Sequence, residues 1–185
     1  MQRIVLLWLA TLLLSACVQP PQTVSTPVPE ENKVTVIGTQ QIYLGYWRGR
    51  NFSNAQQFIA DEKVNYSALD NLQQNAWSLN GYWTVGKDYS VSNDNEARLS
   101  LKFTAKDVYL TASPAKSGAK ILVMVDNLKV KQTGLAGADV NADSEAEVNS
   151  DNLFHLVHSD NLLSGKTITI TVPAGMSVYS FTFGN

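Results

Sequence analysis

The sequence predicts an all-β domain, an antiparallel jelly-roll β-sandwich with one or two short helices. Short runs of β-branched and aromatic residues recur along the chain, Gly-, Asn- and Pro-rich turns separate them, and strands do not alternate with long helices. The 185 residues are 44% hydrophobic and only 16% charged, which argues against a highly charged helical bundle. A net charge of −2 provides no basic surface, so no nucleic-acid partner is expected.

The N-terminal segment predicts a lipid anchor. Arg3 precedes an apolar run over residues 4–14, which is too short for a transmembrane helix of about 20 residues but suits a signal peptide. The run ends in Leu14-Ser15-Ala16-Cys17, which resembles a bacterial lipobox. We therefore expect residues 1–16 to be a signal peptide and Cys17 to carry lipid. The alternative is ordinary secretory cleavage beside an unrelated cysteine, but no second cysteine exists to pair with Cys17.

A proline-rich tether follows the anchor. Four of the six prolines lie between residues 18 and 33, where neither a helix nor a β-ladder can continue, so residues 17–33 are expected to form an extended spacer. The lipid would hold the protein on a membrane of the bacterial cell envelope. Residue 18 is Val rather than Asp, which by the sorting preference of enterobacterial lipoproteins favours the outer membrane, facing the periplasm.

Residues 34–185 form the predicted sandwich. Residues 98–104 alternate strictly between apolar and polar side chains, as do residues 167–172, which is typical of half-buried strands. In the run 77–85, Trp77 and Trp83 fall on the same face and are expected in the core. Short helices are expected over 54–63 and 67–75. The remaining predicted strands are 34–37, 41–46, 108–111, 121–125, 153–157 and 178–183.

The sequence contains no recognisable catalytic constellation, so the protein is not expected to be an enzyme. His155 and His158 are three residues apart at the end of a predicted strand, where they need not share a face. Asp160 is close by, but no nucleophile in a Gly-x-Ser-x-Gly turn completes a triad. We expect both histidines to be structural or loop residues.

An acidic segment leaves two interpretations open. Asp139, Asn141, Asp143 and Glu145 alternate with small apolar residues. Such alternation favours an edge strand with a charged, solvated face, which discourages edge-to-edge aggregation. The alternative is a weak calcium site, although the glycine and the final glutamate of a calcium loop are replaced by Ser144 and Ser150. No other cofactor is expected.

The segment 43–50 is the candidate ligand site. Tyr46, Trp47, Arg48 and Arg50 combine aromatic rings with guanidinium groups, which suits a flat polar ligand such as a sugar. The alternative is that the aromatic rings fill the core while the arginines are solvated. Tyr43 is expected in the core, and for Trp47 and Arg48 both interpretations stay open.

The ordered set of segments resembles one known family. The residues that carry the resemblance are 42–46 (IYLGY), 51–52 (NF), 77–86 (WSLNGYWTVG), 99–110 (LSLKFTAKDVYL), 122–126 (LVMVD), 153–157 (LFHLV) and 173–184 (PAGMSVYSFTFG). This set is similar to the C-terminal β-sandwich of DipZ-type proteins, which fuse a cytochrome-biogenesis membrane part and a thioredoxin-like domain to a module resembling carbohydrate-binding modules. The resemblance implies a galactose-binding-like jelly roll and a role in glycan binding. Thiol chemistry is not carried over, because the chain has no Cys-x-x-Cys motif.

Two functions remain open at this point. The first is a membrane-anchored, non-catalytic lipoprotein that binds carbohydrate or cell-wall glycan. The alternative is a module that binds a periplasmic protein partner, such as a thioredoxin-like or cytochrome-biogenesis protein. A hydrolase is the weakest interpretation, because no pair of carboxylates with a defined spacing can be recognised.

Overall fold

The computed structural model describes residues 37–185. The predicted signal peptide, Cys17 and the tether lie outside the described residues. Within this range the structure has twelve strands and one helix. None of its helices is long and apolar enough to span a bilayer. The strands are β1 Ile42–Tyr43, β2 Lys63–Tyr66, β3 Trp77–Val85, β4 Ser90–Ser92, β5 Ala97–Ala105, β6 Asp107–Ser113, β7 Ala119–Val125, β8 Leu128–Lys129, β9 Glu145–Val148, β10 Asn152–Val157, β11 Leu163–Val172 and β12 Ser177–Gly184, with helix α1 Val130–Thr133 between β8 and β9.

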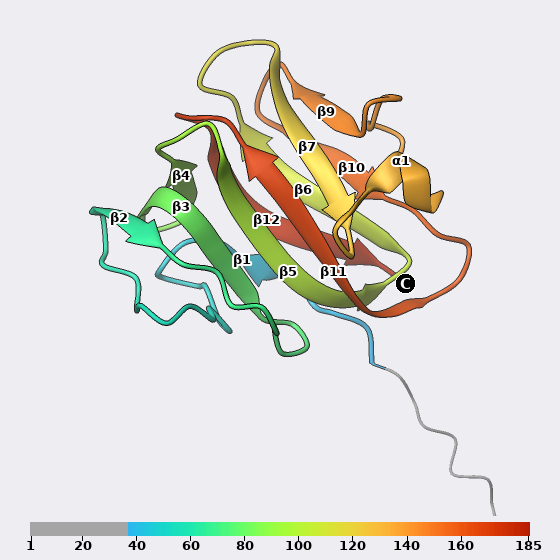
Figure 1. Ribbon diagram of the computed structural model, residues 1–185, viewed down its shortest axis with the longest axis horizontal. Coiled ribbons are helices and arrows are strands. Elements are labelled where there is room, and N and C mark those ends of the chain that lie inside the picture. Colours follow the sequence, from blue (N-terminus) through green and yellow to red (C-terminus); the bar gives the residue numbers. More distant parts are fainter. Residues whose placement is uncertain (1–36) are drawn as a thin grey trace, which may run out of the picture. The chain divides into compact units, whose positions relative to one another are not determined.

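The strands form two layers, and every pairing between them is antiparallel. One layer has the order β10-β6-β12-β4-β3, with β1 on β12 and β2 on β3. The other has the order β3-β5-β11-β7-β8, with β9 also on β7. Figure 1 shows β5, β11 and β7 in front of β6, β10 and β12. The predicted all-β antiparallel sandwich is therefore confirmed.

Strand β3 belongs to both layers and joins them. Its first half, Trp77 to Asn80, pairs with β5, and its second half, Trp83 to Val85, pairs with β4. Gly81 stands between the two halves at φ 85°, a conformation that L-residues with a Cβ rarely adopt. The glycine lets the strand turn from one layer into the other.

The core lies between the layers and follows the predicted alternation. In β5, Leu99, Leu101 and Phe103 are fully buried, while Ser100 and Lys102 point outward and are partly exposed. Trp77 and Trp83 are also fully buried, as expected. Because the inner faces take the apolar side chains, the outer faces keep the polar ones, and these are the surfaces on which a binding site can form.

The two predicted helices are wrong. Residues 54–63 and 67–75 hold loops, bridges and strand β2, and the one helix in the described part lies elsewhere, at α1. The amide of Asn54 explains part of the difference. It accepts from the backbone N–H of Leu79 at 2.9 Å and donates to the carbonyls of Leu79 and Ser67 at 2.7 Å each. These contacts replace the local hydrogen bonds that a helix would need.

Candidate functional site

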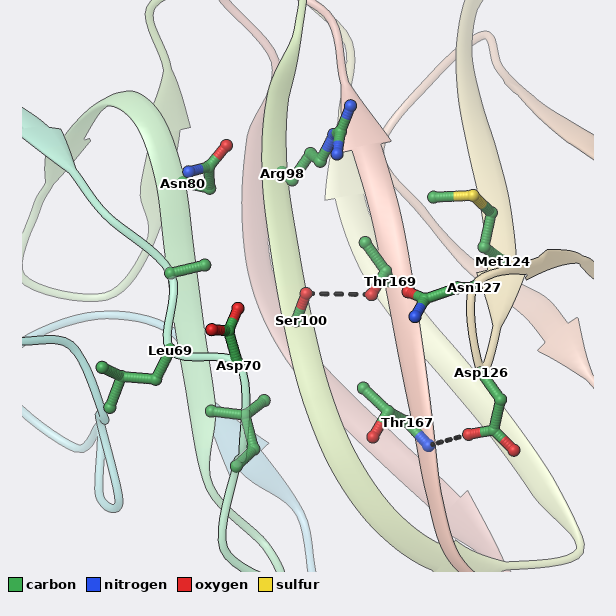
Figure 2. Close-up of a pocket in the computed structure, with 12 residues that line it drawn as sticks. Leu69, Asp70, Asn80, Arg98, Ser100, Met124, Asp126, Asn127, Thr167 and Thr169 are labelled. Carbon is green, nitrogen blue, oxygen red and sulfur yellow. Dashed lines mark hydrogen bonds between the residues drawn. The ribbon is translucent and has the colours of Figure 1, made fainter.

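A groove crosses the outer face of the second layer. It encloses about 430 Å³, and its floor is made by side chains of β3, β5, β11 and β7. Cross-strand pairing places Asn80 opposite Arg98, and Ser100 opposite Thr169. The Ser100 and Thr169 hydroxyls hydrogen-bond at 2.9 Å, as Figure 2 shows. The floor therefore presents hydroxyl, amide and guanidinium groups on a rigid sheet.

Two irregular segments form the walls of the groove. Leu69 and Asp70 lie on one side, from the loop between β2 and β3, and Asp126 and Asn127 lie on the other (Figure 2). Asp126 and Asn127 form the β7–β8 turn with φ 49° and 66°, which is typical of a tight two-residue hairpin turn. Leu69 is 40% exposed and provides an apolar surface beside the polar floor.

The charged side chains Asp126 and Arg98 of the groove differ in their hydrogen bonds and ion pairs. The Asp126 carboxylate accepts from Lys166 Nζ at 2.8 Å and from the Thr167 backbone N–H at 3.0 Å. Partial burial disfavours its ionised form, but these hydrogen bonds outweigh burial and hold the pKa of Asp126 below its ordinary value. Arg98, by contrast, is exposed and forms no ion pair with any carboxylate in residues 37–185. Its guanidinium donors are free for a ligand rich in oxygen.

Of the four residues of the candidate ligand site in segment 43–50, the structure brings two together on the surface, Trp47 and Arg48. Trp47 is 59% exposed, and Arg48 beside it is exposed too. The Arg48 guanidinium lies 4.0 Å from the centroid of the Tyr43 ring, and Lys87 Nζ lies 4.9 Å from that of Trp47. Tyr43 is only half-buried, so its expected place in the core is wrong: its neighbours Ile42 and Leu44 fill the core instead.

The other two residues of the candidate ligand site, Tyr46 and Arg50, have partners of their own. The Tyr46 hydroxyl donates to Asp61 at 3.3 Å, and burial together with this carboxylate raises the pKa of Tyr46 above its ordinary value. Arg50 is exposed and donates to the Gly49 carbonyl at 3.3 Å. Its own carbonyl accepts from Trp77 Nε1 at 2.8 Å, which ties this segment to the core. Trp47 and Arg48 thus form a small exposed platform rather than a pocket.

The acidic segment is organised by turns and one ion pair. Asp139, Asp143 and Glu145 are absent from the one group in the described range in which three His, Cys, Asp or Glu ligand atoms lie within 4.8 Å of one another. Asn141 instead accepts from the backbone N–H groups of Asp143 and Glu145, and Glu145 pairs with Lys120 at 2.9 Å. The predicted edge strand is present only from Glu145, as β9, because these turns occupy the residues before it.

That one group contains both histidines together with Asp107. Asp107 Oδ1 lies 2.9 Å from His155 Nε2 and 2.7 Å from His158 Nδ1. Burial opposes the charge of Asp107, but the hydrogen bonds from the two histidines outweigh it and lower the pKa of this carboxyl. The sequence places Asp107 48 residues before His155, so the three residues meet only through the pairing of β10 with β6.

Comparisons with known proteins identify one matching family and several similar proteins. The family described as "Thioredoxin like C-terminal domain" matches residues 39–184. Protein DipZ of Mycobacterium bovis and that of Mycobacterium tuberculosis are each 24% identical over 167 residues, which is 90% of this chain and 21% of theirs. The chain thus spans about a fifth of the length of these relatives. Among solved structures, CsCBM6-3 from Clostridium stercorarium in complex with cellobiose covers 52% of this chain, and this chain covers 73% of it, with 12% identity and a TM-score of 0.30.

Proposed function

Since the chain belongs to the family of thioredoxin-like C-terminal domains, we propose that it is a non-catalytic binding module that takes carbohydrate or cell-wall glycan in the groove. The supporting observation is the lining of the groove. Hydroxyl and amide groups of Asn80, Ser100 and Thr169 stand beside the free guanidinium of Arg98. A sugar chain carries many hydroxyls that can each pair with such groups, and its apolar ring faces can lie against Leu69.

The rigidity of the floor favours binding without a large conformational cost. Arg98 and Ser100 are on β5, and Thr169 is on β11. Each of these two strands lies in the middle of the layer and pairs with a neighbouring strand on both sides. The loop segment around Asp70 is the irregular part of the site. Ligands that meet a preformed surface lose less affinity to ordering than ligands that must organise a loop.

The platform of Trp47 and Arg48 remains a second proposed contact surface. An exposed indole with cations at its side suits sugar rings, but it equally suits an acidic protein surface. The exposure of Trp47 is what favours the alternative function, docking of a periplasmic partner such as a thioredoxin-like or cytochrome-biogenesis protein. Both functions agree with a lipid anchor at Cys17 that places the module in the cell envelope, on the periplasmic side of the outer membrane.

One binding experiment separates these proposals. The full chain is screened on a glycan array that includes peptidoglycan fragments, and hits are measured by titration calorimetry with three variants. Arg98→Ala should lower the affinity for a ligand bound in the groove by about 10-fold or more, as expected for loss of an anchoring contact of roughly 1.4 kcal/mol or more. Trp47→Ala and Lys131→Ala should leave this affinity unchanged. Lys131 is the control, because it is an exposed cation outside both surfaces.

The opposite pattern would contradict the groove. If a glycan binds and only Trp47→Ala weakens it, the platform is the site. If no glycan binds while a periplasmic protein does so in a Trp47-dependent manner, the docking function replaces the carbohydrate function.

A further inference from the structure

The cluster of Asp107, His155 and His158 lies on the layer opposite to the groove, and the proposed function does not use it. Asp107 is on β6, His155 is on β10, and His158 directly follows β10. All three are on the outer face: the neighbours Val108 and Leu110 in β6, and Leu156 in β10, are fully buried in the core. The side chains of Asp107 and His155 are 22% and 19% exposed, whereas that of His158 is 53% exposed.

A β-bulge brings the two histidines to the same face. His155 lies opposite Tyr109 and Val157 lies opposite Val108, so β10 contains one extra residue at this point. Leu156 and Val157 consequently both point into the core, and His158 returns to the face that His155 occupies. Bulges of this kind often redirect a side chain at a functional position.

The surroundings fix these side chains in place. The His155 ring stacks on the Tyr109 ring at 4.4 Å between centroids, and its backbone N–H donates to Asp139 at 2.6 Å. The His158 backbone N–H donates to the Leu135 carbonyl at 2.9 Å. On β12, Gly184 leaves space for the Asp107 carboxylate, because a Cβ there would lie 2.8 Å from Asp107 Oδ2. The ligand atoms are therefore held together before any ion arrives.

We propose that Asp107, His155 and His158 bind a divalent first-row transition metal ion, such as Zn²⁺. Two imidazole nitrogens and one carboxylate oxygen form a ligand set that these ions favour. Zinc lies about 2.0–2.2 Å from such ligands, so a tetrahedral ion needs neighbouring ligand atoms about 3.4 Å apart. The side chains have to separate by roughly half an ångström from their hydrogen-bonded positions, which small rotations supply. The solvent-exposed side at His158 leaves room for water as a further ligand.

The two histidines would bind the ion through different ring nitrogens. Binding through Nδ1 requires the tautomer that carries its proton on Nε2, and Asp160 Oδ1 lies 3.8 Å from that Nε2. At 3.8 Å, and with its side chain 98% exposed, Asp160 makes no hydrogen bond to Nε2, so solvent can accept this proton. At His155, the ion would bind Nε2, and the proton that Nε2 now donates to Asp107 moves to Nδ1.

The test is equilibrium dialysis of Zn²⁺ with the full chain carrying Cys17→Ala, which removes the only thiol as a competing ligand. We expect one Zn²⁺ per chain and a melting temperature that rises with the Zn²⁺ concentration, because the ion binds the folded state. His158→Gln and Asp107→Asn should each abolish both effects. Asp160→Asn should change binding little, because this exposed carboxylate makes no hydrogen bond to the His158 ring. Asp151→Asn, an exposed carboxylate outside the cluster, is the control and should change neither effect.

Two outcomes would overturn the proposal. The first is absence of saturable Zn²⁺ binding by the Cys17→Ala chain without further substitutions. In that case the cluster only connects β10 to β6 by hydrogen bonds. The second is binding that persists unchanged in His158→Gln, which would place the ion elsewhere. His158 is more than half exposed, so this variant is expected to fold even where Asp107→Asn does not, and circular dichroism without metal checks this.

Discussion

Trp47 and Trp77 allow the distinction between a surface platform and the core to be measured. Trp47 is 59% exposed, whereas Trp77 is fully buried and donates from Nε1 to the Arg50 carbonyl at 2.8 Å. Trp77 also packs on Phe52 with 4.7 Å between ring centroids. Replacing each tryptophan by alanine should therefore change the free energy of unfolding by very different amounts.

The structure gives the expected magnitudes. A large aromatic side chain buries about 250 Å² at most, and Trp47 keeps roughly 40% of its surface covered, or about 100 Å². At about 25 cal/mol per Å² this is an upper bound of ~2.5 kcal/mol, and the retained Cβ lowers the expected loss to about 1–2 kcal/mol. Trp77→Ala leaves a cavity and an unpaired Arg50 carbonyl, so its expected loss is about 4–5 kcal/mol.

Urea unfolding followed by circular dichroism measures both losses, with thermal melting as a second readout. At about 2–4 °C per kcal/mol for a domain of this size, Trp47→Ala should lower the melting temperature by a few degrees and Trp77→Ala by roughly 10–20 °C. The slope of the unfolding free energy against urea should stay constant, since neither change alters how much surface unfolding exposes. Equal losses in the two variants would refute the reasoning, because Trp47 would then be a core residue and no platform.

Two further predictions concern the anchor and one ion pair. The parental chain should fractionate with membranes and Cys17→Ala should be released, as the lipobox predicts; equal fractionation of the two would contradict lipidation. The pKa of the Asp126 carboxyl is lowered in the folded state, so its stabilising contribution is present above the unfolded pKa of about 3.9 and is lost as the pH falls through the folded value. Unfolding free energies measured between pH 7 and pH 3 should consequently fall less steeply in Asp126→Asn than in the parental chain, and an identical pH dependence would show that Asp126 contributes nothing.

The strands that the sequence predicts well are those with strict alternation. The strictly alternating segments 98–104 and 167–172 lie inside β5 and β11. Alternation can be recognised in a short stretch of sequence, and burial of one face of the strand directly stabilises an alternating segment. The helices expected over 54–63 and 67–75 fail for the converse reason. Long-range contacts, such as those of Asn54 with Leu79, decide the conformation there.

The functional surfaces were harder to predict because they depend on pairing between distant strands. Ser100 and Thr169 are visible in the sequence as outward-facing polar residues, but their neighbourhood requires the register of β5 against β11. The walls of the groove are added by turns and loops whose positions no periodicity reveals. The approach of His158 to Asp107 depends on a single extra residue in β10, and an alternation rule applied without that bulge places His155 and His158 on opposite faces.

The arrangement of the two layers also determines how the two proposed sites can influence each other. The groove is on the outer face of β5, β11 and β7, and the Asp107 cluster is on the outer face of β6 and β10. A core of fully buried side chains, including Leu101 and Leu110, separates the outer faces, and stacked sheets lie about 10 Å apart. Residues this far apart that share no partner usually contribute independently. Metal binding at the cluster should therefore leave glycan binding in the groove unchanged, so Arg98→Ala and His158→Gln should each affect only their own ligand.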